Sequence, residues 1–523
     1  MSKVISASQA VSVIPDAAMV AVNSSSGLGC PDAVLAALGA RFDDTGHPRD
    51  LTTIHPIAAG DMFGTPGVDH IAKPGCLATI IGGSYPSGPT RADPPRIWQM
   101  ITGNRLKAYN LPSGIIFDML REGAGHRPGV LTKVGMDTFV DPDLEGGAMN
   151  QAAASDPIVT RMPFDGEDWL YFRALKPDIA ILRATTADER GNLSFEGEGA
   201  TLGAMEMALA THNAGGTVIA QVRQVTRAGT LRPHDVRVPG ILVDHVVEAP
   251  DMLQTTATPY DPAISGEVIR PLDSFSIPEF GISKVIARRV AQELRSGWAV
   301  NVGFGVSANV PRIFLEEGQH GIVTWVIEQG AVGGIPLLDF KFGCAANAEA
   351  FVASPHQFTY FQAGGFDCSL LSFLEVDADG SVNVSRLAAT PHRTAGAGGF
   401  VDITARAGRI VFSGTFNAGA RMHVQDGKLV IDAEGHTAKF VPKVDQVSFS
   451  GRRAQAQAQQ ATYVTERCVI ELRADGLTVT EVAPGIDLDR DILGQSATPL
   501  KVAGDVRDMD PALFRPDLIG LPP

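Results

Sequence analysis

A glutamate at the end of a strongly apolar segment is the side chain best suited to covalent chemistry in this sequence. Five of the six residues at 322–327 are apolar, which predicts a strand buried on both faces. Glu328 follows it, and Gly330 and two more glycines come next. Ligands of open α/β sheets bind beyond the carboxyl ends of the strands, where a carboxylate can attack an activated acyl group. Taken alone, these residues also fit a solvated glutamate without a chemical role.

A glycine-rich turn at 395–399 is the second candidate. Gly396, Gly398 and Gly399 precede an expected short helix, and free N–H groups at such a turn can bind an anion or an oxyanion. An ordinary tight turn would have the same composition. The stretch SSSGLG at 24–29 lacks the GxGxxG pattern, so a dinucleotide site is not supported. The sequence has no Walker, HExxH or GxSxG motif and no His or Cys cluster with metal-ligand spacing, so we expect no metal.

The elements that must position these residues alternate between strands and helices. Strands are expected at 18–23, 51–58, 77–83, 177–186 and 216–225, and again at 298–305 and 321–330, with helices beginning near 31 and 282. This alternation predicts an α/β fold with largely parallel sheets. The proline-rich stretch at 250–280 reads as a linker. We therefore expect two open, Rossmann-like α/β domains at 1–270 and 281–523, with the site in the cleft between them.

Composition excludes several classes of function. With 523 residues, the chain has room for two to four domains. It carries 43 Lys and Arg against 58 Asp and Glu, a net charge of −15, which disfavours nucleic acid and anionic membranes as partners. Five widely spaced Cys suggest a reducing compartment, the cytoplasm. No apolar run approaches the ~18 residues that span a bilayer, and polar residues interrupt the N-terminal segment, so neither a membrane span nor a signal peptide is expected.

Motifs along nearly the whole chain resemble those of the family I coenzyme A (CoA) transferases. The resemblance is to the fused single-chain branch, which includes acetate and propionate CoA-transferases, and it runs from about residue 10 to about residue 515. The motifs that carry it lie at 48–61, 107–114, 129–142, 185–192, 228–244, 284–294, 326–336, 347–351, 396–403, 411–416, 463–472 and 481–493.

The resemblance implies a ping-pong transfer of CoA from a short-chain acyl-CoA to a carboxylate acceptor. Glu328 of the E-x-G motif would be the nucleophile and would form a glutamyl-CoA thioester. Gly398 and Gly399 would donate to the oxyanion, with Gly396 and Gly330 in the same oxyanion and CoA site. Residues expected to line the substrate pocket are Gly83, Ser84, Ser113 and Asn347. CoA would be a substrate, with no permanently bound cofactor, and the protein would be a homo-oligomer, a dimer or a tetramer.

Three departures from the family pattern concern the pocket. Relatives carry Gln where this chain has Ser113, and often His where it has Cys30; the GGSYP segment at 82–86 also lacks the expected aromatic–Gly pattern. Either these changes are drift, or the acyl group is larger or more polar than acetate. Two other functions stay open: a thioester hydrolase that uses the same Glu328, and a ligand sensor without catalysis. Against the sensor stand the acidic balance, the intact E-x-G motif and the lack of a helix-turn-helix extension.

Overall fold

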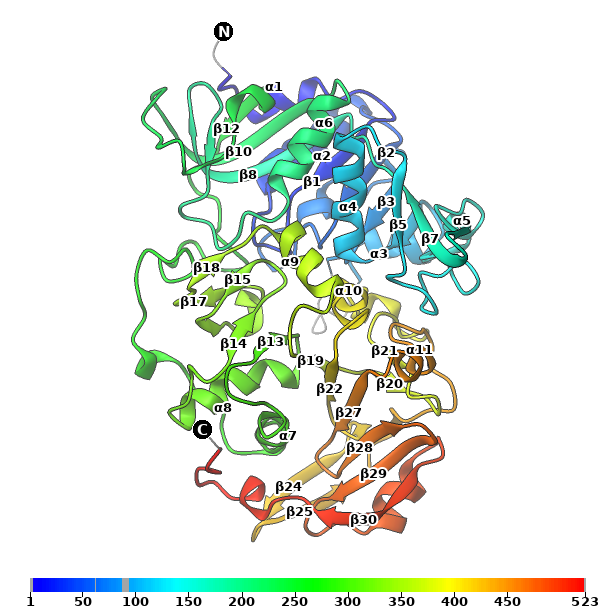
Figure 1. The fold of residues 1–523 in the computed structure, drawn as a ribbon. Coiled ribbons are helices and arrows are strands. Elements are labelled where there is room, and N and C mark those ends of the chain that lie inside the picture. The colour runs from blue at the N-terminus through cyan, green and yellow to red at the C-terminus, as the bar shows by residue number, and fades with distance from the viewer. Residues whose placement is uncertain (1–2, 62, 87–93, 522–523) are drawn as a thin grey trace.

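Each half of the chain folds around one large β-sheet, as the alternation of strands and helices predicts. The computed structural model describes residues 3–61, 63–86 and 94–521. Figure 1 shows the N-terminal half, blue to green, stacked on the C-terminal half, green to red, with α9 and α10 at the junction. Residues 250–280, the predicted linker, contain one short helical turn, η3 (Leu272–Ser274), and no strand.

The N-terminal sheet is built around seven parallel strands in the order β12-β10-β8-β1-β2-β3-β4. The chain moves outward from β1 to β4 and then returns to the other side of β1, so the strand order reverses between β1 and β8. This reversal places the loop after β1, which contains SSSGLG, at the position where open α/β sheets bind ligands. The bounds are β1 (Met19–Val22), β2 (Leu51–His55), β3 (Leu77–Gly82), β4 (Lys107–Asn110), β8 (Ile179–Asp188), β10 (Thr217–Thr226) and β12 (His245–Glu248).

Helices cover both faces of this sheet. Residues of α1 (Ala7–Ser12), α2 (Asp32–Thr45) and α3 (Arg96–Thr102) pack on one face. Residues of α4 (Ser113–Ala124) and α6 (Ala204–Asn213) pack on the other. The short strands β9 (Leu193–Ser194) and β11 (Val236–Val238) extend the sheet beyond β8, and β5 (Gly129–Thr132), β6 (Val159–Phe164) and β7 (Glu167–Arg173) form a separate antiparallel sheet.

The C-terminal sheet has a parallel centre flanked by antiparallel strand pairs, and its last strand runs parallel to its neighbour. Its order is β18-β15-β14-β13-β19-β22-β27-β28-β29-β30, and the strands from β14 to β27 are parallel. The central bounds are β13 (Ala299–Val302), β14 (Thr324–Val326), β19 (Cys368–Ser372), β22 (Arg409–Ser413) and β27 (Gln460–Val464). The edge strands are β15 (Ala331–Val332), β18 (Ala350–Phe351), β28 (Cys468–Arg473), β29 (Gly476–Val482) and β30 (Lys501–Asp508).

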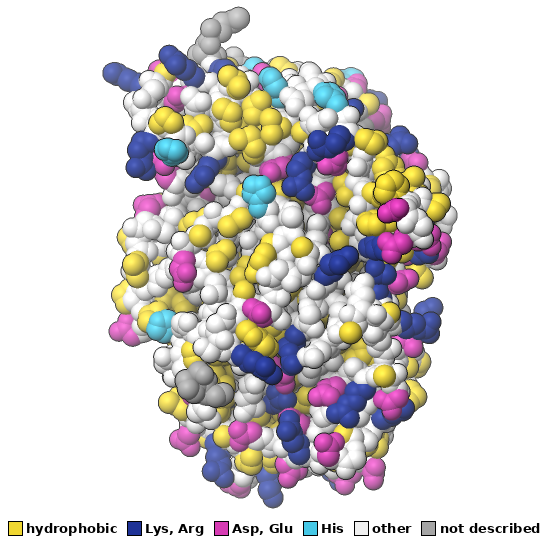
Figure 2. Space-filling model, in the orientation of Figure 1, with side chains coloured by type: hydrophobic (Ala, Val, Ile, Leu, Met, Phe, Trp, Pro, Cys, Tyr) yellow, Lys and Arg dark blue, Asp and Glu magenta, His cyan; other side chains and the backbone are white. Residues whose placement is uncertain are grey.

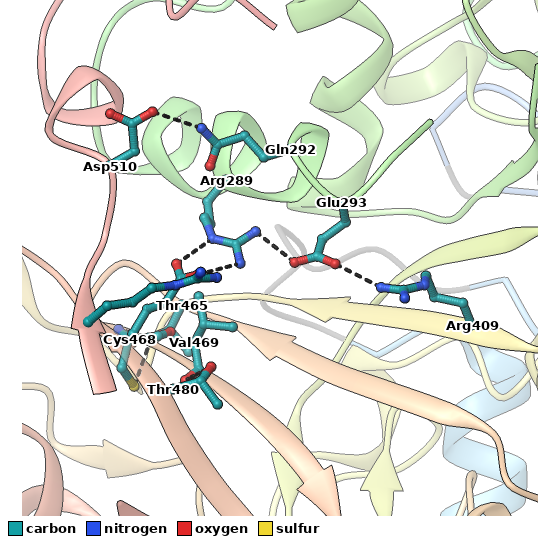
Figure 3. A network of polar contacts seen from close by, with 11 residues as sticks. Arg289, Gln292, Glu293, Arg409, Thr465, Cys468, Val469, Thr480 and Asp510 are labelled. Atoms are coloured by element: carbon teal, nitrogen blue, oxygen red, sulfur yellow. Dashed lines mark hydrogen bonds and ion pairs between the residues drawn. The ribbon is translucent and has the colours of Figure 1, made fainter. Parts of the chain in front are cut away.

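An ion-pair network fastens α7 (Ile282–Ala291) to this sheet. Arg289 Nε lies 2.7 Å from a carboxylate oxygen of Glu481 on β29, and both side chains are buried. Arg289 also pairs with Glu293, which pairs in turn with Arg409 at the start of β22, as Figure 3 shows. Because removing one partner would leave a buried charge, this network fixes the helix on β22 and β29.

One hydrophobic core runs through both halves. It joins side chains of α4 to those of α9 (Ser354–Gln362) and α10 (Phe400–Thr404), and the Phe117 and Phe358 rings lie 6.0 Å apart across the junction. Backbone groups also cross it, because Phe139 N–H donates to the Val447 carbonyl at 2.7 Å. The two halves therefore meet as packed parts of one molecule.

The face of the molecule in Figure 2 carries acidic and basic side chains interspersed. Lysines and arginines do not gather into one field on this face, in keeping with the acidic balance of the sequence. Among the described residues, no helix combines the length and the apolar character that crossing a membrane requires.

Candidate active site

Glu328 lies two residues beyond β14, in a tight turn that leads into β15. Ile327 N–H donates to the Ala331 carbonyl, and Gly330 N–H donates to the Ile327 carbonyl, both at 2.9 Å. Gly330 has φ +124°, and a Cβ on it would lie 1.9 Å from the Val352 carbonyl oxygen. Conformation and space therefore both require glycine here, which is the physical reason for the second fixed position of the E-x-G motif.

The residue between them, Gln329, ties the nucleophile to the N-terminal half. Its Nε2 donates to Glu328 Oε1 at 3.0 Å and to Ser25 Oγ at 3.2 Å. Its own carbonyl accepts from Ser354 Oγ at the start of α9 (2.9 Å). Ser25 lies in the SSSGLG loop after β1. The loop at the strand-order reversal of the first sheet therefore faces Glu328, which belongs to the second sheet.

Protein surrounds the Glu328 carboxyl group densely, although part of the side chain stays accessible to solvent. This burial raises the pKa of Glu328 from 4.5 to about 7, while hydrogen bonds from the Gln329 side chain and the Gly399 N–H act in the opposite direction. The result is a carboxylate with the basicity of an imidazole. A carboxyl group with a raised pKa next to hydrogen-bond donors is typical of a functional site.

The glycine turn lies against Glu328. A Cβ on Gly399 would be 2.3 Å from Glu328 Oε2 and 2.6 Å from Phe358 Cε1. The Gly398 N–H donates to the Gly83 carbonyl (2.7 Å), so it is engaged in this structure, whereas the Gly399 N–H acts on Glu328. Of the two predicted oxyanion donors, Gly399 is the one that faces the nucleophile.

Asn110, the last residue of β4, holds this turn on the N-terminal sheet. Its Nδ2 donates to the carbonyls of Gly82 and Gly83, and its Oδ1 accepts from Ala397 N–H at 2.9 Å. Gly396, with φ +94°, packs directly on the Asn110 amide: a Cβ there would lie 3.0 Å from Nδ2. The first domain thus shapes the backbone that the second domain presents to Glu328.

Three predicted pocket residues lie at the same edge of the first sheet. Ser113 is fully buried in the first turn of α4, its N–H donates to the Gly398 carbonyl (3.0 Å), and its Oγ has no partner among the described residues. Gly83 has no room for a side chain, since a Cβ would lie 2.4 Å from Ser113 Oγ. Ser84 Oγ accepts from Ala58 N–H (2.8 Å). These residues are brought to the turn that faces Glu328.

Asn347, the fourth predicted pocket residue, is engaged elsewhere. Its amide accepts from Arg270 N–H (2.8 Å) and donates to the Arg270 carbonyl (2.9 Å). Arg270 belongs to the segment that connects the two sheets. Asn347 therefore anchors the linker segment in this structure, and its role in the substrate pocket stays a prediction.

A narrow apolar pocket, without room for a water molecule in this structure, includes the residue before Glu328. That residue is Ile327, and the lining also includes Phe342, whose ring meets that of Phe304 edge-on with centroids 5.3 Å apart. Phe304 is 62% exposed and lies two residues beyond β13. The lining residues of the pocket are Val302, Ala308, Ile327, Pro336, Leu337, Phe342, Gly343 and Cys344. The described residues contain no cluster of His, Cys, Asp or Glu that could hold a metal ion.

Sequence reasoning missed three site residues: Gln329, Asn110 and Asp402. Asp402 lies on α10 and is fully buried, with Oδ2 accepting from Gly114 N–H at 2.9 Å. Asn110 and Asp402 lie within or beside motif segments, at 107–114 and 396–403, but no spacing rule links residues so far apart in the chain. Gln329 is the variable position of E-x-G and carries no signal of its own.

Comparison with known proteins gives agreement over the full chain. Residues 4–249 match the family model described as coenzyme A transferase. A caffeate CoA-transferase of Acetobacterium woodii is 39% identical over 530 residues, covering 100% of this chain and 99% of that protein. The acetate CoA-transferase YdiF of Escherichia coli O157:H7 is 36% identical over 516 residues, covering 98% and 95%.

The fold agrees as closely as the sequence. The crystal structure of the YdiF apoenzyme superposes with a TM-score of 0.92 at 35% identity, covering 99% of this chain and 97% of that one. A second YdiF structure, described as a thioester complex with CoA, gives a TM-score of 0.90 at 34% identity over the same shares.

Proposed function

Because the chain belongs to the coenzyme A transferase family, we propose that Glu328 carries CoA as a covalent glutamyl thioester during transfer between two carboxylic acids. The chain is a CoA-transferase; the proposal concerns how it works and on what. The observation that supports it is the carboxyl group of Glu328, held between the Gln329 amide and the Gly399 N–H, in a turn that requires Gly330.

The reaction proceeds in balanced steps. The Glu328 carboxylate attacks the thioester carbonyl of acyl-CoA, the C–S bond breaks, and a mixed anhydride and CoA thiolate form. The thiolate attacks the glutamyl carbonyl of the anhydride, which releases the first acid and leaves a glutamyl-CoA thioester. An acceptor carboxylate attacks that thioester and expels the thiolate, and the thiolate then takes the new acyl group and regenerates Glu328. Each half-reaction exchanges one carboxylate for another, so no net proton or redox partner is needed.

The Gly399 N–H is the group that we assign to the oxyanion. Every step makes a tetrahedral oxyanion, and a backbone donor aimed at it contributes about 3–4 kcal/mol to the barrier in comparable enzymes. The donor already faces Glu328 in the resting structure, and Asn110 and Ser113 hold its turn in place. Little reorganisation is therefore required when the charge develops.

The raised basicity of Glu328 favours its role as a nucleophile. With a pKa of about 7, the carboxylate is more basic than a solvated one and still charged at pH 8. Activity should therefore rise with pH as Glu328 ionises.

A trapping experiment tests the covalent role. We expect incubation with acyl-CoA and no acceptor, followed by borohydride, to reduce a thioester on the peptide that contains Glu328. Mass spectrometry identifies the modified residue, and the Glu328→Ala variant should show neither the adduct nor transfer. Wild-type transfer by that variant would refute the mechanism.

We propose an apolar acyl group as the preferred cargo. The relatives are described as acting on caffeate and on acetate, acids that differ greatly in size. The pocket beside Ile327 is lined by apolar residues, and the exposed Phe304 ring lies against Phe342 of its lining; this apolar character supports an apolar acyl group over a polar one. A panel of acyl-CoAs crossed with carboxylate acceptors, read by mass spectrometry, ranks the substrates.

Hydrolysis remains the competing fate of the same intermediate. Water in place of the acceptor carboxylate would turn the enzyme into a thioester hydrolase, and the outcome depends on how well the site excludes water. Product analysis with and without an acceptor separates the two. Without an acceptor, a transferase should release about one equivalent of the free acid per enzyme and keep CoA on Glu328, whereas a hydrolase should release CoA continuously.

We also propose a cytoplasmic homo-oligomer, a dimer or a tetramer. All five cysteines are free and buried, which suits a reducing compartment. The oligomer is implied by the family resemblance, and light scattering on the purified protein measures it directly.

A further inference from the structure

A second buried carboxyl group lies behind the glycine turn. Asp402 follows Gly399 by three residues on α10 and is fully buried. Its Oδ2 accepts from Gly114 N–H on α4 at 2.9 Å, and its Oδ1 accepts from Gln362 Nε2 on α9 at 3.0 Å. The Asp402 side chain thus joins α10 to α4 of the other domain and to α9 of its own domain.

The contact is too close to be incidental. A Cβ on Gly114 would lie 2.6 Å from Asp402 Oδ1 and 2.7 Å from Gln362 Nε2, so the α4 backbone reaches Asp402 only because residue 114 is glycine. The residue before it, Ser113, donates from its N–H to the Gly398 carbonyl. The first turn of α4 therefore holds the glycine turn by two adjacent N–H groups, one of them through Asp402.

The Phe358 side chain lies against both glycines. A Cβ on Gly114 would be 2.8 Å from Phe358 Cβ, and a Cβ on Gly399 would be 2.6 Å from Phe358 Cε1. Gly114 contacts Asp402 and Gly399 contacts Glu328, so both carboxyl groups lie near this one buried aromatic side chain. Charges separated by apolar side chains interact more strongly than charges separated by water.

The charged groups around Asp402 are acidic. α4 brings Asp118, whose own partner is Arg121, and the turn after β14 brings Glu328; α9 brings the neutral Gln362. Burial raises the pKa of Asp402 to about 8, against the hydrogen bonds from Gln362 and Gly114, and the charges of Asp118 and Glu328 raise it further. Two coupled carboxyls titrate as a pair, so the charge on one depends on the charge of the other.

We propose that Asp402 is a positioning residue that fixes the Gly396–Gly399 turn on α4, and that it releases a proton to solvent when Glu328 loses its charge in the covalent intermediate. This inference rests on the proposed function, because it requires Glu328 to become a neutral acyl derivative. In the resting enzyme the Glu328 charge favours protonated Asp402. Once Glu328 is esterified to CoA that charge is gone, so Asp402 ionises; the proton returns when the acceptor carboxylate frees Glu328.

Proton release during the first half-reaction tests this inference. The steps from acyl-CoA and the Glu328 carboxylate to a glutamyl thioester and a free carboxylate involve no net proton. Wild-type enzyme is mixed with acyl-CoA at pH 7.5 without an acceptor in a weakly buffered indicator dye. With a pKa of about 7, about a quarter of Glu328 is protonated at this pH and gives up its own proton, so any further proton must come from a neighbouring group.

The Asp402→Asn variant should form the adduct without this further proton and release only the fraction that Glu328 itself held. Gln362 can rotate its amide to present its oxygen to the new Nδ2, so the side chain keeps a partner on α9. We expect adduct formation to slow by about tenfold with KM unchanged, because the glycine turn is held less firmly. Asp118→Asn is the matched control. It removes a carboxyl group that lies next to Asp402 and not next to Glu328, and this variant should still release the Asp402 proton.

Two readouts separate this inference from the proposed function. Intact-protein mass spectrometry counts the adduct, and Glu328→Gln reports protons released on CoA binding alone. No adduct in the wild type would refute the covalent role of Glu328. An adduct without the further proton, or with equal release from Asp402→Asn, would refute the role of Asp402 and leave the nucleophile intact.

Discussion

Replacing Glu328 by Gln should make the protein more stable at pH 8 while abolishing transfer. The pKa of Glu328 is about 7 in the folded protein and close to 4.5 when the chain is unfolded. A carboxyl group with a higher pKa in the folded state holds its proton more tightly when folded. Wild-type stability therefore falls as the pH rises from about 4.5 to about 7, and the lost stability does not return above that range.

The magnitude follows from the same shift. A change from 4.5 to about 7 corresponds to about 3 kcal/mol at 1.36 kcal/mol per pKa unit. Because solvent reaches part of the Glu328 side chain, about 1–3 kcal/mol is the expected range. Gln has nearly the same shape, and its oxygen can still accept from Gln329 Nε2, so the substitution removes the charge and little else.

Urea unfolding of both proteins at pH 5 and at pH 8 measures the effect. We expect Glu328→Gln to be more stable than wild type at pH 8, and the difference to shrink below about 1 kcal/mol at pH 5, where Glu328 of the folded wild type is protonated. A difference independent of pH would show that desolvation of the carboxylate is not its cause. A variant less stable than wild type at pH 8 would contradict the raised pKa itself.

The remaining predictions concern the glycine turn and the acyl pocket. Gly399→Ala places a Cβ 2.3 Å from Glu328 Oε2 and should lower kcat at least 100-fold. Gly398 has φ +56° and nothing within 4 Å of the Cβ position, so Gly398→Ala should cost about 1–2 kcal/mol of stability and retain most activity. Equal losses of activity in the two variants would mean that the turn is structural only. Ser113→Gln should shift relative kcat/KM toward acetyl and propionyl groups by about 1–3 kcal/mol, at a similar cost in stability from overpacking; an unchanged substrate ranking would exclude Ser113 from selectivity.

The placement of Glu328 after a buried strand and of a glycine at 330 could be predicted because these signals are local. An apolar strand ends, a carboxylate follows, and Gly330 adopts φ +124°, a conformation that side chains rarely tolerate. Strand positions in both sheets were also predicted within a few residues, because parallel buried strands are apolar along their whole length. The proline-rich stretch at 250–280 was rightly expected to interrupt the alternation.

The roles of Asn110, Gln329 and Asp402 could not be predicted in the same way. Each depends on a contact between the two domains: Asn110 with Ala397, Gln329 with Ser25, and Asp402 with Gly114. Such pairs are separated by 287 to 304 positions, so no periodicity or spacing in one segment can reveal them. The contact between Asn347 and the linker residue Arg270 could not be predicted for the same reason, although the motif that contains Asn347 was recognised in the sequence.

The domain junction also constrains how substrate and water reach Glu328. The glycine turn is held by backbone hydrogen bonds from Tyr85 to Ala395, from Gly398 to Gly83 and from Ser113 to Gly398. Each is worth about 0.5–1.5 kcal/mol, and the apolar core shared by α4, α9 and α10 adds to them, so separating the domains during each turnover would be costly. We therefore expect substrate to enter without separation of the domains, and the bound acyl group itself to displace water from the anhydride. An acyl group that fits the apolar pocket poorly would leave room for water, so the ratio of hydrolysis to transfer should follow acyl fit.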